Sequence, residues 1–505
     1  MIEQIVAFRQ AEPDLQQVFS VSRRDLWALL LVTTLTGCTH DEAPQTTGAL
    51  PFAGQDVRLA VPADFGFREV WEGPLNEWAA QSGARYSLAE YTPSESSGPF
   101  AGSPDSAQNT LAIFPLEQAA EMIAAGELAP IPASVLEGSD NGIQWQDLFG
   151  GVRQKLASRK GQPLFVPLSA PVLVCYFRQD LLSAAGLAPP QTWDDYQQLL
   201  DNLATWAPEC TAVEPWSEAF RATLFLARAV SLAQHPGQYS LFLDIETGDP
   251  LIDSPGFVRA LDAARAALQK MPPDVLKYDP ADCRNELLQG RAALAIACES
   301  PAVGSTAATA PAADRPGPME IGFIRLPGSR EVYNSDRRTW EPLADKSINR
   351  VTLTGFSGWG VGTSARCSVL QAEASWNALI KLCSSSLTTG FPPGIVGLCR
   401  ESQLQSAGGL ETHLEARDAI LYANAVAQSL RDTRLVADVP MIGRRQFRQS
   451  LASALTSAIG GSETSELALQ TAARDWREII GKIGAAKVRD SYRVTLGLSP
   501  KPPRE

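Results

Sequence analysis

The feature that most constrains the fold is a regular alternation of short strands and amphipathic helices early in the chain. Residues 57–61, 86–91 and 111–114 are short apolar or alternating runs that predict strands. Residues 67–82 and 116–125 carry apolar side chains at helical spacing and predict helices that follow two of these strands. Alternation at these lengths is typical of α/β layers around a largely parallel sheet.

Segments with strand spacing and segments with helical spacing of their apolar residues continue to alternate through the rest of the chain. The stretch PLFVPLSAPVLVCYF, residues 163–177, is apolar and extended, but its three prolines predict a crossing segment rather than one regular central strand. Thr192 and Asp195 have the spacing of a capping-box variant at a helix start. Residues 301–318 form a low-complexity linker or loop. Further predicted helices are 192–206, 218–233, 254–270, 281–288, 446–459 and 463–483, and further strands are 292–297, 321–326 and 360–363.

The N-terminal stretch VSRRDLWALLLVTTLTGCTH has the order of a signal peptide. Arg23 and Arg24 precede an apolar run over residues 26–36, and small residues follow. This run is short of the roughly 20 residues that a membrane-spanning helix needs. The sequence LTGC ending at Cys38 resembles a bacterial lipobox, and the arginine pair resembles a twin-arginine export signal. A buried N-terminal helix and an uncleaved anchor are the alternatives.

Size and charge exclude some functions. The 505 residues exceed one typical core and predict two lobes or domains. The formal net charge is −13, and no basic stripe offsets it, so nucleic acid is not an expected partner.

The eight cysteines contain no CxxC pair, which argues against zinc ribbons and thioredoxin-type chemistry. Cys175 and Cys298 lie in apolar, strand-like runs and are predicted to be core residues. If Cys38 is lipidated, seven thiols remain and at least one is unpaired. Export permits disulfides among the others, but the sequence does not assign them.

Catalytic motifs are not found. The three histidines, His40, His235 and His413, form no cluster with metal-ligand spacing. The stretch 355–359 lacks the final glycine of a nucleophile elbow, and the GxGxxA match at 360–365 lacks a surrounding βαβ unit. Scattered glycosidase carboxylates remain an open alternative. We therefore expect no catalytic residue, no metal and no cofactor.

One segment resembles a known family. Residues 161–203 contain FRQDL at 177–181 and GLAPPQTW at 186–193, and they resemble the most recognisable segment of family 1 extracellular solute-binding proteins. The family's usual Tyr-Asn-Lys-Asp is Phe-Arg-Gln-Asp here. Further similar pieces follow in the family's order at 242–248, 252–255, 288–296 and 357–361.

The resemblance implies a two-lobed periplasmic-binding-protein fold of type II. Each lobe would be a mixed α/β sheet flanked by helices, and hinge crossings would join the lobes and allow closure on a ligand. The implied division is 1–37 lipoprotein signal peptide, 38–55 flexible tether, 56–170 first part of lobe 1, 171–318 first part of lobe 2, 319–385 return to lobe 1, 386–490 C-terminal helices of lobe 2, and 491–505 tail.

Candidate ligand-binding residues follow from position and chemistry. Aromatic faces stack on sugars, and acids accept hydroxyl hydrogen bonds. Ligands in α/β sheets lie beyond the carboxyl ends of strands. The Glu-Pro-Trp sequence at 214–216 is similar to a cleft motif of maltose-binding relatives, and PMIGRR at 440–445 lies where the family places cleft residues. The candidates are Asp64, Phe65, Phe114, Glu117, Glu214, Trp216, Glu299, Trp340, Trp359 and Arg444. Core packing is the alternative for Trp216 and Trp359, and a surface position is the alternative for Trp340.

The resemblance implies a binding protein rather than an enzyme. We expect an extracytoplasmic, membrane-anchored monomer that captures a small solute, a sugar or oligosaccharide, and delivers it to the permease of an ABC importer. A sensor of the same fold without a permease and an extracellular hydrolase are the alternatives.

Overall fold

The structure is a computed structural model. It describes residues 50–93, 98–100, 108–136, 143–298, 319–383, 397–407 and 414–501. The predicted signal peptide and Cys38 lie outside the described residues. No helix in the described part of the chain combines the length and the apolar character needed to cross a membrane.

The first sheet and its helices form the first lobe. The strand order is β2-β1-β3-β14-β6. Its strands are β1 (Asp56–Pro62), β2 (Arg85–Tyr91), β3 (Leu111–Pro115), β6 (Val166–Pro167) and β14 (Trp359–Thr363). β1 pairs parallel with β2 and β3, whereas β14 is antiparallel to β3 and β6. The sheet is therefore mixed, because the chain re-enters it late and in the opposite direction.

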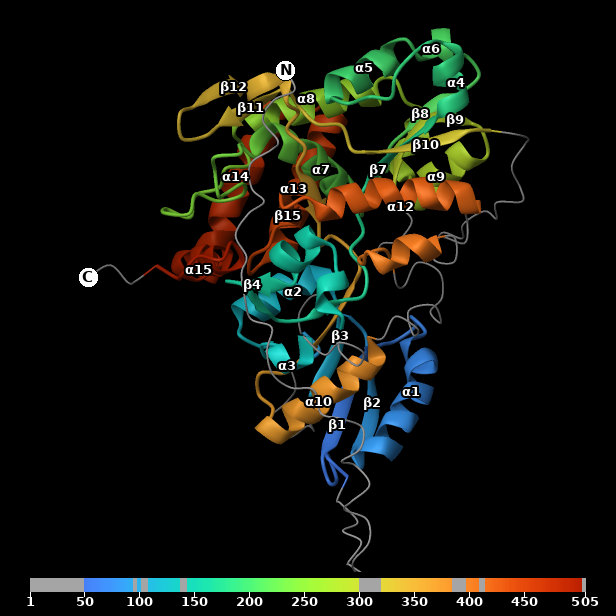
Figure 1. Cartoon of the computed structure of the whole chain (residues 1–505). Helices are drawn as coiled ribbons and strands as arrows, with labels where there is room; N and C mark the ends of the chain where they lie inside the picture. The colour runs from blue at the N-terminus through green and yellow to red at the C-terminus, as the bar shows by residue number, and fades with distance from the viewer. Residues whose placement is uncertain are drawn as a thin grey trace, which may run out of the picture. The chain divides into compact units, whose positions relative to one another are not determined.

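Helices cover this sheet, and α1 is one that the apolar periodicity predicts, whereas the range of α10 was not predicted. Helix α1 (Phe67–Ser82) has the predicted bounds and buries Trp71, Leu75 and Trp78. Helix α10 (Val369–Leu382), from late in the chain, packs against α1 and β1 and lies beside the N-terminal strands in Figure 1. The core of this lobe therefore joins segments about 300 residues apart, as the hydrogen bond from Trp78 Nε1 to Asn377 Oδ1 (2.8 Å) illustrates.

The second sheet and its helices form the second lobe. The strand order is β10-β7-β9-β8, with β7 (Val174–Arg178), β8 (Thr211–Val213), β9 (Ala292–Ala297) and β10 (Ile321–Arg325). The sequence prediction placed residues 321–325 in the return to lobe 1, and this is wrong. They form an antiparallel ladder with β7, so the return begins after β10.

Most helices of the second lobe match the predicted ranges within a few residues. Helix α12 packs on β7 and β10, and α9 packs on β9. The capping box of Thr192 and Asp195 is confirmed. The matching helices are α5 (Trp193–Asp201), α6 (Leu203–Trp206), α7 (Arg221–Ala233), α8 (Pro255–Leu268) and α9 (Pro280–Leu288). The ranges of α4 (Gln179–Ala184) and α12 (Ala416–Arg431) were not predicted.

The segments that connect the two sheets run beside one another. Leu168 N donates to Trp359 O (2.8 Å), which joins the first crossing to the start of β14. The second crossing contains β13 (Thr352–Thr354), which pairs parallel with β15 (Leu435–Ala437) of the third. The crossing predicted from the prolines of residues 163–177 is thus part of a hydrogen-bonded bundle of connections.

Gly358 stands at the contact between the first two crossings. Its φ is 95°, and a Cβ there would lie 2.7 Å from Pro171 Cδ and 2.8 Å from Ser169 O. Only glycine therefore permits both the backbone angle and the close approach. The Ser169 hydroxyl accepts a hydrogen bond from Trp359 N at 3.0 Å, which fixes the residue that begins β14.

Three helices follow β15: α13 (Arg444–Ile459), α14 (Ser465–Ile483) and α15 (Ala485–Thr495). α13 packs on α14 and α7, and α15 packs on α14 and on α2 (Leu116–Ala124) of the first lobe. Because α15 runs to Thr495, the prediction of a tail from residue 491 is wrong.

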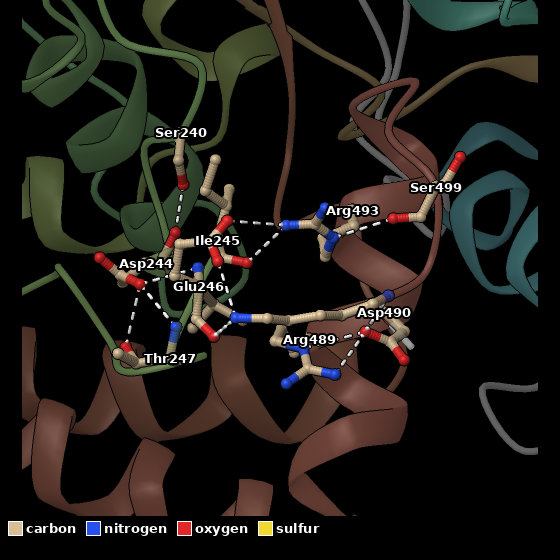
Figure 2. Close-up of polar contacts among 11 residues, drawn as sticks. Ser240, Asp244, Ile245, Glu246, Thr247, Arg489, Asp490, Arg493 and Ser499 are labelled. Carbon is tan, nitrogen blue, oxygen red and sulfur yellow. Dashed lines mark hydrogen bonds and ion pairs between the residues drawn. The ribbon is translucent and has the colours of Figure 1, made fainter. Parts of the chain in front are cut away.

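Figure 2 shows how Arg493, in the last turn of α15, contacts a loop of the second lobe. Arg493 Nη1 donates to Ile245 O (2.8 Å), and Lys501 Nζ contacts Glu246 Oε2 (2.7 Å). Within the loop, Asp244 Oδ1 accepts from the backbone N–H of Glu246 (2.8 Å) and Thr247 (2.6 Å). The contacts up to Lys501 tie the chain end to the second lobe.

Several short elements were not predicted. They include α3 (Ala133–Leu136), the strand pair β4 (Ser158–Arg159) and β5 (Gln162–Pro163), the hairpin of β11 (Glu331–Asn334) and β12 (Thr339–Pro342), and also β8, β13, β15 and α15. One π-helical turn, Val152–Leu156, precedes β4.

The cysteines of the described residues are free thiols. Cys175 and Cys298 lie in the core, as predicted. Burial raises the pKa of Cys383 to about 12 and that of Cys399 to about 11. Because the thiolate is the reactive form, these side chains are expected to be unreactive packing groups.

Candidate functional site

The carboxyl ends of the first-lobe strands bring several candidate residues together. β1 leads to Phe65, β3 leads into α2 with Glu117 in its first turn, and β14 begins at Trp359. Trp359 is the register partner of Pro115, so it lies beside the start of α2. The half-buried Phe65 ring packs edge-on against Trp359 at 4.8 Å between ring centroids. This is the edge of the sheet where α/β proteins bind ligands.

The start of α13 contacts α2 at this edge. Glu121 Oε1 accepts hydrogen bonds from the backbone N–H of Gly443 (2.8 Å) and Arg444 (3.3 Å). A carboxylate at a helix N-terminus is favourable because the free N–H groups and the helix dipole both attract it. Arg444 Nη2 in turn lies 3.9 Å from Glu117 Oε1. A helix of the first lobe thus caps a helix that packs on the second lobe.

Asp438 completes the group of charges. It is 2% exposed, and Arg444 Nη2 contacts its Oδ2 at 2.7 Å. Arg448 also pairs with Oδ2 and donates from Nη2 to Thr223 Oγ1 of α7 (2.8 Å). We call Glu117, Glu121, Asp438, Arg444 and Arg448 the interlobe ion cluster.

The two arginines of the cluster differ in their electrostatics. Burial opposes the charge of Arg444, but attraction to Asp438 and Glu117 outweighs it and raises the pKa of its guanidinium. Burial lowers the pKa of Arg448, and Asp438 offsets this only in part. Asp438 Oδ1 is buried and has no hydrogen-bond partner within the described part of the chain. The cluster therefore offers charged donors and one unused acceptor.

The structure brings some of the predicted residues together here. Phe65 meets Trp359, and Glu117 meets Arg444. Asp64 is exposed directly after β1, with a φ of 67°. Trp359 itself is 3% exposed and also packs on Phe67, so packing against neighbouring rings accounts for it.

Other predicted residues are placed in the core. Glu214 and Trp216 have no exposed surface; Glu214 accepts from Arg228 Nη2 (2.6 Å) and from Trp216 Nε1 (2.9 Å). Their polar atoms pair with one another and with Arg228 in this structure, and a contact of either residue with a ligand stays a prediction. Phe114 is likewise buried and packs on Phe165 at 5.4 Å.

Trp340 lies away from this edge. Trp340 is part of the β11–β12 hairpin, where it packs on Tyr333, and the Arg259 guanidinium lies 4.8 Å from its ring. Glu299 lies outside the described residues.

Sequence reasoning missed Glu121, Asp438, Arg448 and Thr223. Helix spacing was the available signal. Glu117 and Glu121 are four residues apart in α2, and Arg444 and Arg448 are four apart in α13, so each pair shares one helix face. Nothing local indicates that the acidic face meets the basic one. No three His, Cys, Asp or Glu side chains within the described ranges are arranged to hold a metal ion.

Two α/β lobes joined by several crossings, with a charged cluster where their helices meet, define the class of two-lobed binding proteins. The comparisons agree with this class. The model of the family described as "Bacterial extracellular solute-binding protein" matches residues 90–381, which is more than half of the chain. The chain belongs to this family of solute-binding proteins.

Solved structures with the same fold include sugar-binding proteins. Maltose-bound MalE3 of Thermotoga maritima has a TM-score of 0.56 and 16% identity, covering 84% of this chain and 99% of that chain. The sugar-binding protein MalE of Xanthomonas citri has a TM-score of 0.60 and 17% identity, and the match covers 85% of this chain and 98% of that chain. An ABC transporter solute-binding protein of Agrobacterium radiobacter, in complex with ribitol, has a TM-score of 0.57 and 19% identity. The match covers 85% of this chain and 100% of that chain. No curated protein sequence matches the chain.

Proposed function

We propose that this protein captures a small carbohydrate or polyol at the interlobe ion cluster and delivers it to an ABC importer, without turning it over. Membership of the solute-binding family supports the binding role. The similar proteins from Thermotoga maritima and Agrobacterium radiobacter carry maltose and ribitol, which supports this ligand class.

The observation that carries the proposal is the placement of the cluster between a first-lobe helix and a helix packed on the second lobe. Glu117 is about one-third exposed, so its carboxylate can accept hydroxyl hydrogen bonds, while Arg444 can donate them. The half-buried ring of Phe65 offers an apolar face to a sugar at the same strand edge. Asp64 follows β1 at that edge and is kept as a further ligand candidate. A solute that contacts groups from both lobes would favour the closed arrangement.

Binding is tested by thermal unfolding of the purified protein against monosaccharides, oligosaccharides and polyols. We expect saturable stabilisation by at least one of them, about 2.7 kcal/mol when the ligand is at 100 times its Kd. Glu117→Gln should weaken that ligand at least tenfold. Glu331→Gln, which alters an exposed ion pair with Arg259, is the matched control and should leave the affinity unchanged. Stabilisation by no sugar or polyol would refute the ligand class.

We also propose that lipidation of Cys38 anchors the protein outside the cytoplasmic membrane, on the strength of the lipobox-like LTGC sequence. Replacing Cys38 by alanine should move the protein from the membrane fraction to the soluble fraction of cells, measured by fractionation and immunoblotting. One lipidated residue supplies the anchor, so its loss removes most of the membrane affinity. Retention of the variant in the membrane fraction would contradict lipid anchoring.

A further inference from the structure

A cavity of about 420 Å³ lies apart from the residues assigned above. Its lining comes from the first lobe, the second lobe, the crossings and the end of α15: residues 154, 155 and 158–160; 234–236, 238, 239 and 241; 351, 433–437 and 440; and 492 and 495–497. None of the five members of the interlobe ion cluster is among its lining residues. The volume is in the range of small-molecule sites.

The lining of this cavity is basic. Lys155, Arg159, Lys160 and Arg434 line it, and none of the described lining residues is acidic. The whole chain has a formal charge of −13, so a local excess of positive charge is unusual for its surface. No ion pair joins Lys155, Arg159 or Lys160 to a carboxylate within the described ranges; Lys160 Nζ contacts only the Ser499 hydroxyl (3.0 Å). His235, which also lines the cavity, pairs with Glu341 at 3.0 Å.

Arg159 is held in place by backbone carbonyls, and no carboxylate in the described part of the chain pairs with it. Its Nη1 donates to the backbone carbonyls of Lys155 (3.0 Å), Leu156 (3.0 Å) and Ser158 (2.8 Å). Its Nε is buried and has no hydrogen-bond partner in the described part of the chain. Burial lowers the pKa of its guanidinium to about 10. Burial of an unpaired charge is unfavourable, and an anion nearby would offset it.

The β15 side of the cavity adds to the positive charge. Burial lowers the pKa of Arg434, an effect that Asp432 opposes and Arg325 reinforces. Asp432 also forms an ion pair with Arg325 at 3.0 Å. Asp432 thus attracts both Arg325 and the lining residue Arg434.

We propose that this cavity binds a small organic phosphate, a phosphorylated sugar or polyol. Guanidinium and ammonium groups are the side chains that recognise phosphate oxygens. The other lining residues suit a hydroxylated body: Ser158, Gln234, Gln238 and Thr433 carry hydroxyls and amides. Tyr239, which is 72% exposed, adds an aromatic face. The site is independent of the proposed transport ligand, and because its lining comes from both lobes, its occupant can bias their closure.

The test is lysine acetylation of the purified chain, mapped by mass spectrometry at constant ionic strength. Glucose 6-phosphate should slow acetylation of Lys155 and Lys160 at least fivefold, and inorganic phosphate should slow it less. Glucose should have no effect on either lysine. Lys277, whose side chain is 82% exposed outside the cavity, should react at the same rate throughout. The proposal would be overturned if glucose 6-phosphate slowed acetylation of Lys277 as much as that of Lys155 and Lys160, or slowed none of them. It would also be overturned if only vesicles containing phosphatidylglycerol protected Lys155 and Lys160 from acetylation.

Variants locate the site by calorimetric titration with glucose 6-phosphate. The double substitution Lys155→Gln and Lys160→Gln changes two exposed side chains, so the fold should persist while affinity falls at least tenfold. Lys277→Gln should leave the affinity unchanged. An unchanged affinity in the double variant would refute the assignment to this cavity. These results do not depend on whether any sugar or polyol stabilises the protein in the thermal-unfolding test of the proposed function.

Discussion

Replacing Arg228 with methionine is expected to lower the free energy of unfolding by about 3–5 kcal/mol. Arg228 is 1% exposed and pairs with Glu214 at 2.6 Å. Its guanidinium also lies 4.2 Å from the centroid of the Trp193 ring. Without it, the Glu214 carboxylate stays buried, and the neutral Trp216 Nε1 that donates to it does not balance its charge. Urea denaturation followed by far-UV circular dichroism measures the change.

Arg259→Met is a matched control, since Arg259 also pairs with a glutamate and lies over a tryptophan. It contacts Glu331 at 3.0 Å and the Trp340 ring at 4.8 Å, but it is 41% exposed. Solvent weakens such a pair, so the expected loss is about 0–1 kcal/mol. Adding Glu214→Gln to Arg228→Met should recover part of the stability, because no unpaired charge then remains. Equal losses in the two single variants would show that burial does not set the energy of the Arg228 pair.

Local patterns carried most of the prediction of the fold. The range of α1 was correct to the residue, because Trp71, Leu75 and Trp78 mark one face at helical spacing and Gly83 ends the helix. The Thr192 capping box likewise needs only four residues of sequence. Strand pairing was harder: β10 was placed in the wrong lobe because its partner β7 is more than 140 residues earlier. A short apolar strand does not reveal its neighbours.

Motif similarity did not indicate where the individual candidate residues lie in the fold. Glu214 and Trp216 look like cleft residues by sequence, but Arg228, fourteen residues later in α7, pairs with the carboxylate inside the core. Glu117 and Arg444 are both predicted binding residues, and their contact joins positions more than 300 residues apart. Asp438 was missed for the same reason, since its role follows from two arginines that α13 brings to it.

The substitution Asp438→Asn is the second change for which we expect a large effect. It should lower the free energy of unfolding by about 3–5 kcal/mol. The amide keeps the shape of the carboxylate but removes the charge that Arg444 and Arg448 share. Two neighbouring guanidinium groups would then remain in a buried site, and burial already lowers the pKa of Arg448. Urea denaturation at neutral pH gives the size of the loss.

Asp432→Asn is the control for this change, because Asp432 pairs with Arg325 but is more exposed than Asp438. This control should lower the free energy of unfolding by less, about 1 kcal/mol. Combining Asp438→Asn with Arg448→Gln should restore part of the stability, since Arg444 would keep Glu117 as its partner. If the double variant is no more stable than the single one, repulsion between the arginines is not the cause. Loss of sugar-dependent stabilisation in Asp438→Asn, with the fold intact, would connect this same charge balance to solute binding.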